Sequence, residues 1–287
     1  MDLDLNHYNP VLSMFKEHYG EAYQLQYRNK PSRHYRQKVD NVAVEKWSIQ
    51  VMKIVPTKHC VDILREECKT QSMRPFKARG SNAIRCPHCL MAEFSCFCHL
   101  RVNQSSPIEF ILLFHRDEIH KPTNSGRLIA DLFPNDTQAY LWSRTEPSAT
   151  LLNQLKNRQG HCTLLFPNTQ TAQIQKRQQR SLVPQTNKTD VKHTFIILDG
   201  TWKQASKMFH QSEWLKDIPH LEISSEAKRS FLVRHSSHQI QFATAEVTAM
   251  LLDTLGHNDH SQLLLNYYQS FNAHCLASRK RSLSLPI

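Results

Sequence analysis

Glycine is scarce in this chain, with six residues among 287. Neither a G-x-G-x-x-G segment nor a G-x-x-x-x-G-K-[ST] segment occurs. Both motifs depend on glycine, because the backbone must approach a phosphate closely. The composition therefore argues against a Rossmann-type dinucleotide site and against a P-loop nucleotide site.

Long hydrophobic runs are also missing. The run FILLF at 110–114 is among the longest, whereas a helix that crosses a bilayer needs about 20 apolar residues. The first ten residues, MDLDLNHYNP, are polar and acidic and lack the apolar segment of a secretory signal. We therefore expect a cytoplasmic protein with no membrane partner, whose cysteines stay reduced.

Positive charge is in excess: 36 Lys and Arg face 25 Asp and Glu, and the formal net charge is +11. An excess of this size favours a polyanionic partner, so we expect RNA or DNA to bind. The basic residues cluster at 28–38, 74–80, 176–180 and 279–281.

The pattern of apolar, polar and cysteine residues divides the chain into four segments. We expect a poorly ordered or loosely helical extension over 1–60, a helix and a cysteine-rich lobe over 61–106, a catalytic domain over 107–277, and a basic tail over 278–287. From residue 107 short apolar runs alternate with amphipathic stretches, which predicts an α/β domain with a mostly parallel sheet and flanking helices. The predicted strands are 108–114, 139–143, 162–166, 195–198 and 221–224; the predicted helices are 61–73, a segment capped by Asn124 or Ser125, one starting at Pro147, one after Gly200, 244–255 and 259–277.

Four of the eight cysteines lie within thirteen residues, in the string CPHCLMAEFSCFC. Two close pairs of thiolates separated by a short loop can complete one tetrahedral shell around a structural zinc ion. The C-x-C spacing of the second pair is tighter than usual, and two disulfides or four buried thiols are the alternatives. His88 and His99 flank the cluster and could replace a sulfur ligand. The candidate ligands are Cys86, Cys89, Cys96 and Cys98.

Asp199 is the candidate general base. It follows the apolar run FIIL, and an acidic residue at the end of a buried strand is easily desolvated, which makes it a better base near neutral pH. The alternative is that Asp199 caps the helix after Gly200. Trp202 packs in the core or forms a stacking surface. Thr244 opens a helix and could be its N-cap.

Two arginines could bind a negatively charged substrate group. Arg127 and Arg144 each lie in a loop or at a helix start after a predicted strand. Arginine at such a position pairs with a carboxylate or phosphate, or forms a structural ion pair.

Several ordered motifs resemble the DTW-domain family, the tRNA-uridine aminocarboxypropyltransferases, and in particular its bacterial members. The family's Asp-x-Thr-Trp signature is similar to residues 199–202, DGTW. The other matching stretches between about 74 and 277 are RPFKARG, RCPHCLMAEFSCFC, KPTNSGRLIADLFP, WSRTEPS, LLFP, LDGTWKQASKMF and ATAEV.

The resemblance implies a SPOUT-like domain with a knot in its C-terminal half, which holds S-adenosyl-L-methionine as co-substrate. It also implies transfer of the 3-amino-3-carboxypropyl group to a uridine in tRNA, with Asp199 as base and Arg127 or Arg144 binding the amino-acid carboxylate. Apart from the resemblance, we expect a monomer. Three loops would cradle the cofactor, through Leu165, Phe166, Pro167, Leu198, Gly200, Thr201, Trp202, Thr244 and Ala245.

Two other functions are compatible with the residues. The first is an S-adenosylmethionine-dependent RNA methyltransferase on the same scaffold. The second is a zinc-containing RNA-binding protein without catalytic activity.

Overall fold

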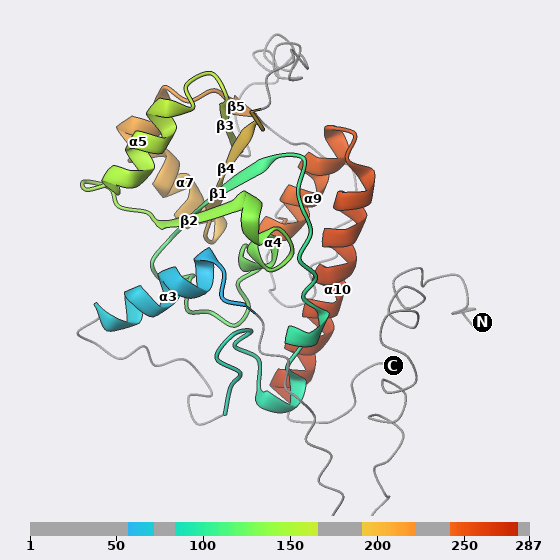
Figure 1. Ribbon diagram of the computed structural model, residues 1–287. Coiled ribbons are helices and arrows are strands. Elements are labelled where there is room, and N and C mark those ends of the chain that lie inside the picture. Colours follow the sequence, from blue (N-terminus) through green and yellow to red (C-terminus); the bar gives the residue numbers. More distant parts are fainter. Residues whose placement is uncertain (1–56, 72–83, 166–190, 222–241, 281–287) are drawn as a thin grey trace, which may run out of the picture. The chain divides into compact units, whose positions relative to one another are not determined.

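Five parallel strands form the sheet at the centre of the computed structural model (Figure 1). The structure describes residues 57–71, 84–165, 191–221 and 242–280. The strand order is β2-β1-β4-β3-β5, and every pairing is parallel. The strands are β1 (Glu109–Phe114), β2 (Thr137–Leu141), β3 (Cys162–Leu165), β4 (Thr194–Asp199) and β5 (His220–Leu221).

The central strands carry apolar side chains on both faces. In β1, Phe110, Leu112 and Phe114 belong to one buried cluster, whereas Ile111 and Leu113 belong to another. Because successive side chains of a strand point to opposite faces, the two clusters are the cores on the two sides of the sheet. A strand buried on both faces needs a continuous apolar run, and EFILLF and TFIILD supply it.

Different helices cover the two faces (Figure 1). The cluster that contains Phe110 also holds buried residues of α3, α4, α9 and α10. The cluster that contains Ile111 holds buried residues of α5, α7 and α8. The helices are α3 (Cys60–Thr70), α4 (Arg127–Leu132), α5 (Ala149–Asn157), α7 (Trp202–His210), α8 (Glu213–Lys216), α9 (Thr244–Thr254) and α10 (Asn258–Lys280).

The expectation of an α/β domain with a parallel sheet and flanking helices is confirmed. The resemblance predicts a knot in the C-terminal half of the domain. Segments 166–190 and 222–241 of that half lie outside the described residues, so the knot stays a prediction. The same holds for the extension over 1–56 and for the basic clusters at 28–38, 74–80 and 176–180. No helix of the described ranges has the length and apolar character that crossing a membrane requires.

The starts of α4 and α5 differ from the sequence prediction, whereas α9 starts where it was predicted. Helix α4 begins at Arg127 with Gly126 as its N-cap, rather than Asn124 or Ser125. Helix α5 begins at Ala149 rather than at Pro147, because the Ser148 side chain accepts a hydrogen bond from the Leu151 backbone and acts as the N-cap. Helix α9 begins at Thr244 itself, and the preceding residue Ala243 is the N-cap. The Glu246 carboxylate accepts a hydrogen bond from the Ala243 backbone N–H at 2.7 Å, so Thr244 is free of the capping role.

Candidate metal centre and active site

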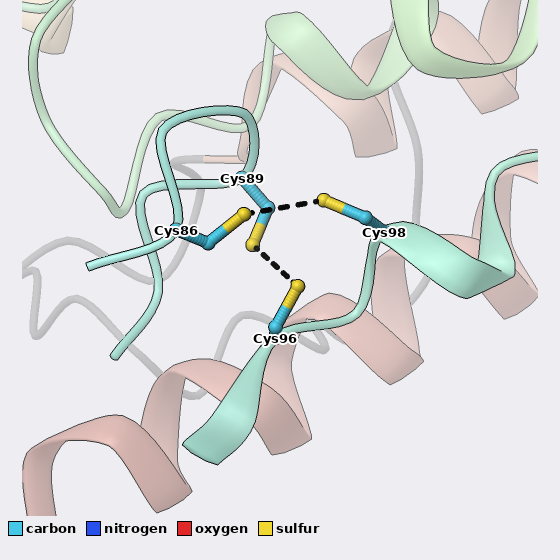
Figure 2. A group of neighbouring side chains, drawn as sticks. All are labelled: Cys86, Cys89, Cys96 and Cys98. Carbon is cyan, nitrogen blue, oxygen red and sulfur yellow. Dashed lines mark hydrogen bonds between the residues drawn. The ribbon is translucent and has the colours of Figure 1, made fainter. Parts of the chain in front are cut away.

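The four clustered cysteines bring their sulfur atoms together (Figure 2). All four sulfurs lie within 4.8 Å of one another. The Sγ atoms of Cys86 and Cys98 are 3.6 Å apart, and those of Cys89 and Cys96 are 3.7 Å apart. Sulfurs held about 2.3 Å from a tetrahedral zinc ion are about 3.8 Å from one another, whereas disulfide sulfurs are about 2.05 Å apart. The residues therefore fit a zinc ion, and the arrangement is not that of two disulfides.

A tight turn sets the first cysteine pair. The Leu90 backbone N–H donates to the Cys86 carbonyl at 3.0 Å, and the Cys86 N–H donates to the Met91 carbonyl at 2.9 Å. Leu90 lies in the left-handed region at φ 59°, which is uncommon for a branched side chain. The second pair follows from two short 3-10 helices, η3 (Glu93–Ser95) and η4 (Cys98–Leu100), which place Cys96 and Cys98 at their adjoining ends.

Without a metal the cluster can carry little negative charge. Hydrogen bonds from Cys96 and Cys98 lower the pKa of Cys89. The bond to Cys89 raises the pKa of Cys96 to about 12, and it also raises that of Cys98. A thiolate on Cys89, which accepts hydrogen bonds from Cys96 and Cys98, thus opposes the loss of a proton from either neighbour. Four simultaneous thiolates require a cation, which zinc supplies.

The cysteine lobe packs on helix α10. Phe97 is fully buried, and its ring centroid lies 5.9 Å from that of Phe271 and 5.6 Å from that of Tyr267. The His274 side chain bonds to the Ser95 carbonyl at 2.9 Å. The lobe belongs to the same compact unit, residues 54–287, as the sheet.

Asp199 ends the central strand β4 and is buried, with 3% of its surface exposed. Its Oδ2 accepts a hydrogen bond from Asn124 Nδ2 at 2.9 Å, and its Oδ1 accepts one from Thr244 Oγ1 at 3.3 Å. Both oxygens act as acceptors, which is the role of an ionised carboxylate. Thr201, not Asp199, caps the following helix α7. The structure thus brings together β4, the loop that precedes α4, and the start of α9.

Gly126 makes the close approach to Asp199 possible. A Cβ atom at this position would lie 1.8 Å from Asp199 Oδ2 and 2.7 Å from its Cγ. Because these are atoms of a short, buried side chain, the carboxylate would have to move. The glycine is therefore part of the Asp199 environment, although it contributes no side chain.

We predict that Gly126→Ala displaces the Asp199 carboxylate and lowers catalytic rate more than it lowers stability. The backbone φ of Gly126, −61°, suits alanine, so the clash with Asp199 is the main cost. Activity and melting temperature of the variant check this. Gly160→Ala is a stability control only, because the positive φ of Gly160 strains any side chain while leaving open space around it. Wild-type activity in Gly126→Ala would contradict the prediction.

The described residues among those expected to cradle a cofactor lie at the carboxyl ends of the parallel strands. Leu165 ends β3, and the segment from Leu198 to Trp202 ends β4 and starts α7; these two strands are neighbours. Thr244 and Ala245 start α9, and Thr244 joins this edge through its bond to Asp199. Phe166 and Pro167 lie outside the described residues. Trp202 is half-buried at the first position of α7.

His115 is a further candidate active-site residue, which the sequence pattern did not single out. It follows β1, and its backbone N–H donates to the Asp199 carbonyl at 2.9 Å. Gln204 Oε1 accepts from the Thr201 N–H at 2.7 Å and from its hydroxyl at 2.8 Å. Its Nε2 therefore donates to His115 Nδ1, at 3.2 Å.

The signal for these missed residues was present in the sequence. Asn124, Gly126 and His115 all belong to the loop HRDEIHKPTNSGR, which follows a predicted strand at the ligand-binding end of a parallel sheet. Their pairing with Asp199 and Gln204, however, joins residues about 75 to 90 positions apart, which local patterns do not report.

The two candidate arginines have different surroundings. Arg144 is exposed in the loop after β2. Two residues earlier, Trp142 stacks on the His115 ring with centroids 5.9 Å apart. Arg127 is 2% exposed, and its guanidinium lies 5.2 Å from the ring centroid of Phe97 and 5.6 Å from that of Phe271. Arg127 is thus enclosed by protein and Arg144 faces solvent, and a substrate-binding role for either residue stays a prediction.

Comparison with known proteins identifies the family of the chain. No solved structure matches the chain. The family model described as the DTW domain matches residues 83–276, which is well over half of the sequence and includes the cysteine cluster, Asn124, Asp199 and Thr244. The chain is a member of the DTW-domain family.

Proposed function

We propose that this protein transfers the 3-amino-3-carboxypropyl group of S-adenosylmethionine to a uridine base of tRNA. The observation that carries the proposal is the buried Asp199 carboxylate, which three separate elements surround at the carboxyl edge of a parallel sheet within a DTW domain. This family is consistent with tRNA modification, and the chain's net charge of +11 suits a polyanionic substrate.

The chemistry needs a base and a dry site. The uridine imide N3–H loses its proton to Asp199, and N3 attacks the γ-carbon of the methionine moiety. The carbon–sulfur bond breaks, and its electron pair leaves with 5′-methylthioadenosine. A uridine anion and a sulfonium cation thus give neutral products, so exclusion of water favours the transition state over the charged reactants.

Other residues have proposed roles in binding and orientation. Arg144 is our candidate for the amino-acid carboxylate, since it is exposed and belongs to the loop that carries Trp142. The proposed cofactor cradle consists of three segments: 165–167, 198–202 and the residues that lead into Thr244 and Ala245. A SPOUT-like connection in the C-terminal half and a structural zinc ion in the cysteine lobe complete the proposal.

Nucleoside analysis tests the proposed reaction. Purified protein, S-adenosylmethionine and tRNA should yield 3-(3-amino-3-carboxypropyl)uridine and 5′-methylthioadenosine, detected by mass spectrometry after digestion of the tRNA. A methylated nucleoside with S-adenosylhomocysteine would instead identify a methyltransferase. Binding of tRNA without either product, and without affinity for S-adenosylmethionine, would identify a non-catalytic RNA-binding protein.

A further inference from the structure

Arg127 is a buried cation that forms no direct ion pair with a carboxylate among the described residues. Its side chain is one of the largest fully buried in this part of the chain. Its Nε and Nη2 atoms have no hydrogen-bond partner there. Leaving a charged donor unsatisfied in the interior costs several kcal/mol in general, so a buried arginine is expected to face an anion.

Nearby carboxylates are already engaged by other cations. Asp62 binds Arg65 at 2.6 Å and Arg101 at 3.3 Å. Asp131 binds Arg101 at 2.8 Å and His59 at 2.8 Å. Arg127 acts on Asp131 only at longer range, whereas Arg65 and Arg101 pair with these carboxylates directly.

The guanidinium of Arg127 lies against the cysteine loops. Its Cζ is 5.2 Å from the ring centroid of Phe97, which lies between Cys96 and Cys98. Its Nη1 donates to the carbonyl of His88, which lies between Cys86 and Cys89, at 3.4 Å. Arg127 therefore touches both halves of the four-cysteine segment.

A zinc-loaded cysteine cluster would place a direct anionic partner beside this guanidinium. Four thiolates around a divalent ion carry a net charge of −2, and a nearby guanidinium offsets part of it in a medium of low dielectric constant. We propose that Arg127 is the counter-cation of the zinc–tetrathiolate centre and that it positions the Asp199 site according to the state of that centre.

A short segment carries the coupling. Arg127 is the first residue of α4, and its backbone N–H donates to Asn124 Oδ1 at 3.1 Å. The same Asn124 donates to Asp199 through its amide nitrogen, and Gly126 lies against the Asp199 carboxylate. One end of residues 124–127 thus touches the cysteine loops and the other end touches Asp199. Arg127 acts through its neighbours, so it is a positioning residue.

Zinc affinity tests the counter-cation role. In the full-length zinc-loaded protein, Arg127→Met should weaken zinc binding about 10- to 100-fold, the usual effect of losing an outer-shell partner. Arg127→Lys keeps the charge and should recover part of the affinity. Competition with a chromogenic chelator measures both. The control is Arg158→Met, which removes the ion pair with Glu109, the first residue of β1. Equal affinity in Arg127→Met and wild type, or an equal loss in Arg158→Met, would overturn the role.

Hydrogen exchange tests the coupling on the wild-type chain, so it does not depend on the folding of any variant. Stripping zinc with a chelator should speed amide exchange at 124–127 and around Asp199, while β2 keeps its protection. Unchanged exchange at 124–127, or loss of protection throughout the sheet, would refute a directed coupling. The identity of Asp199 as an active-site residue rests on the proposed function, but neither measurement uses catalysis. Failure of the proposed reaction and failure of this inference are therefore distinguishable.

Discussion

Cys89→Ser is expected to abolish stoichiometric zinc binding and to destabilise the protein by several kcal/mol, because structural zinc contributes its binding energy to folding. Cys89 is fully buried, and its sulfur lies 3.7 Å from that of Cys96. The lobe also holds Phe97 against α10, so its loss exposes apolar surface there. For a chain of this size we expect the melting temperature to fall by about 10 °C or more.

Metal analysis and thermal melting measure the two effects. Wild-type protein should hold one zinc ion per chain, as a single tetrahedral site requires. The control is Cys162→Ser, since Cys162 is a buried cysteine of β3 that lies outside the cluster. It separates loss of metal from the general cost of burying a hydroxyl. Full zinc content and an unchanged melting temperature in Cys89→Ser would rule out the zinc site.

Asp199→Asn is expected to lower the single-turnover rate by about 10²–10⁴-fold, the usual effect of removing a general base. The fold should persist because asparagine has the same size. Its carbonyl oxygen can accept from Asn124, and its amide can donate to the Thr244 hydroxyl, which then acts as acceptor. Affinity for S-adenosylmethionine should change little, since Asp199 is assigned to the uridine.

Thr244→Ala is the matched comparison, because it removes one hydrogen bond to Asp199 and leaves the carboxylate in place. Its rate should fall less than that of Asp199→Asn. A purely structural role for Asp199 predicts a parallel loss of cofactor affinity, melting temperature and rate. Near-normal turnover in Asp199→Asn would exclude the base role. Asp117, exposed and 3.5 Å from His115, or Glu246 would then be the candidates.

Local patterns in the sequence determined the elements and the type of chemistry. Apolar runs such as FILLF and FIIL predicted the two central strands, because strands buried on both faces need such runs. The spacing of Cys86, Cys89, Cys96 and Cys98 predicted a metal site, because ligands close in sequence remain close in space.

Tertiary structure decided which residues surround Asp199 and where the arginines point. Asn124 and Thr244 reach Asp199 from 75 and 45 positions away. Such contacts follow from strand order and helix packing, and these depend on how whole faces fit together rather than on periodicity. The sequence pattern placed Arg127 and Arg144 alike, each in a loop or at a helix start after a predicted strand. Packing against Phe97 and Phe271 buried the first and left the second exposed, because a helix start fixes where its side chains point only once the neighbouring helices are in place.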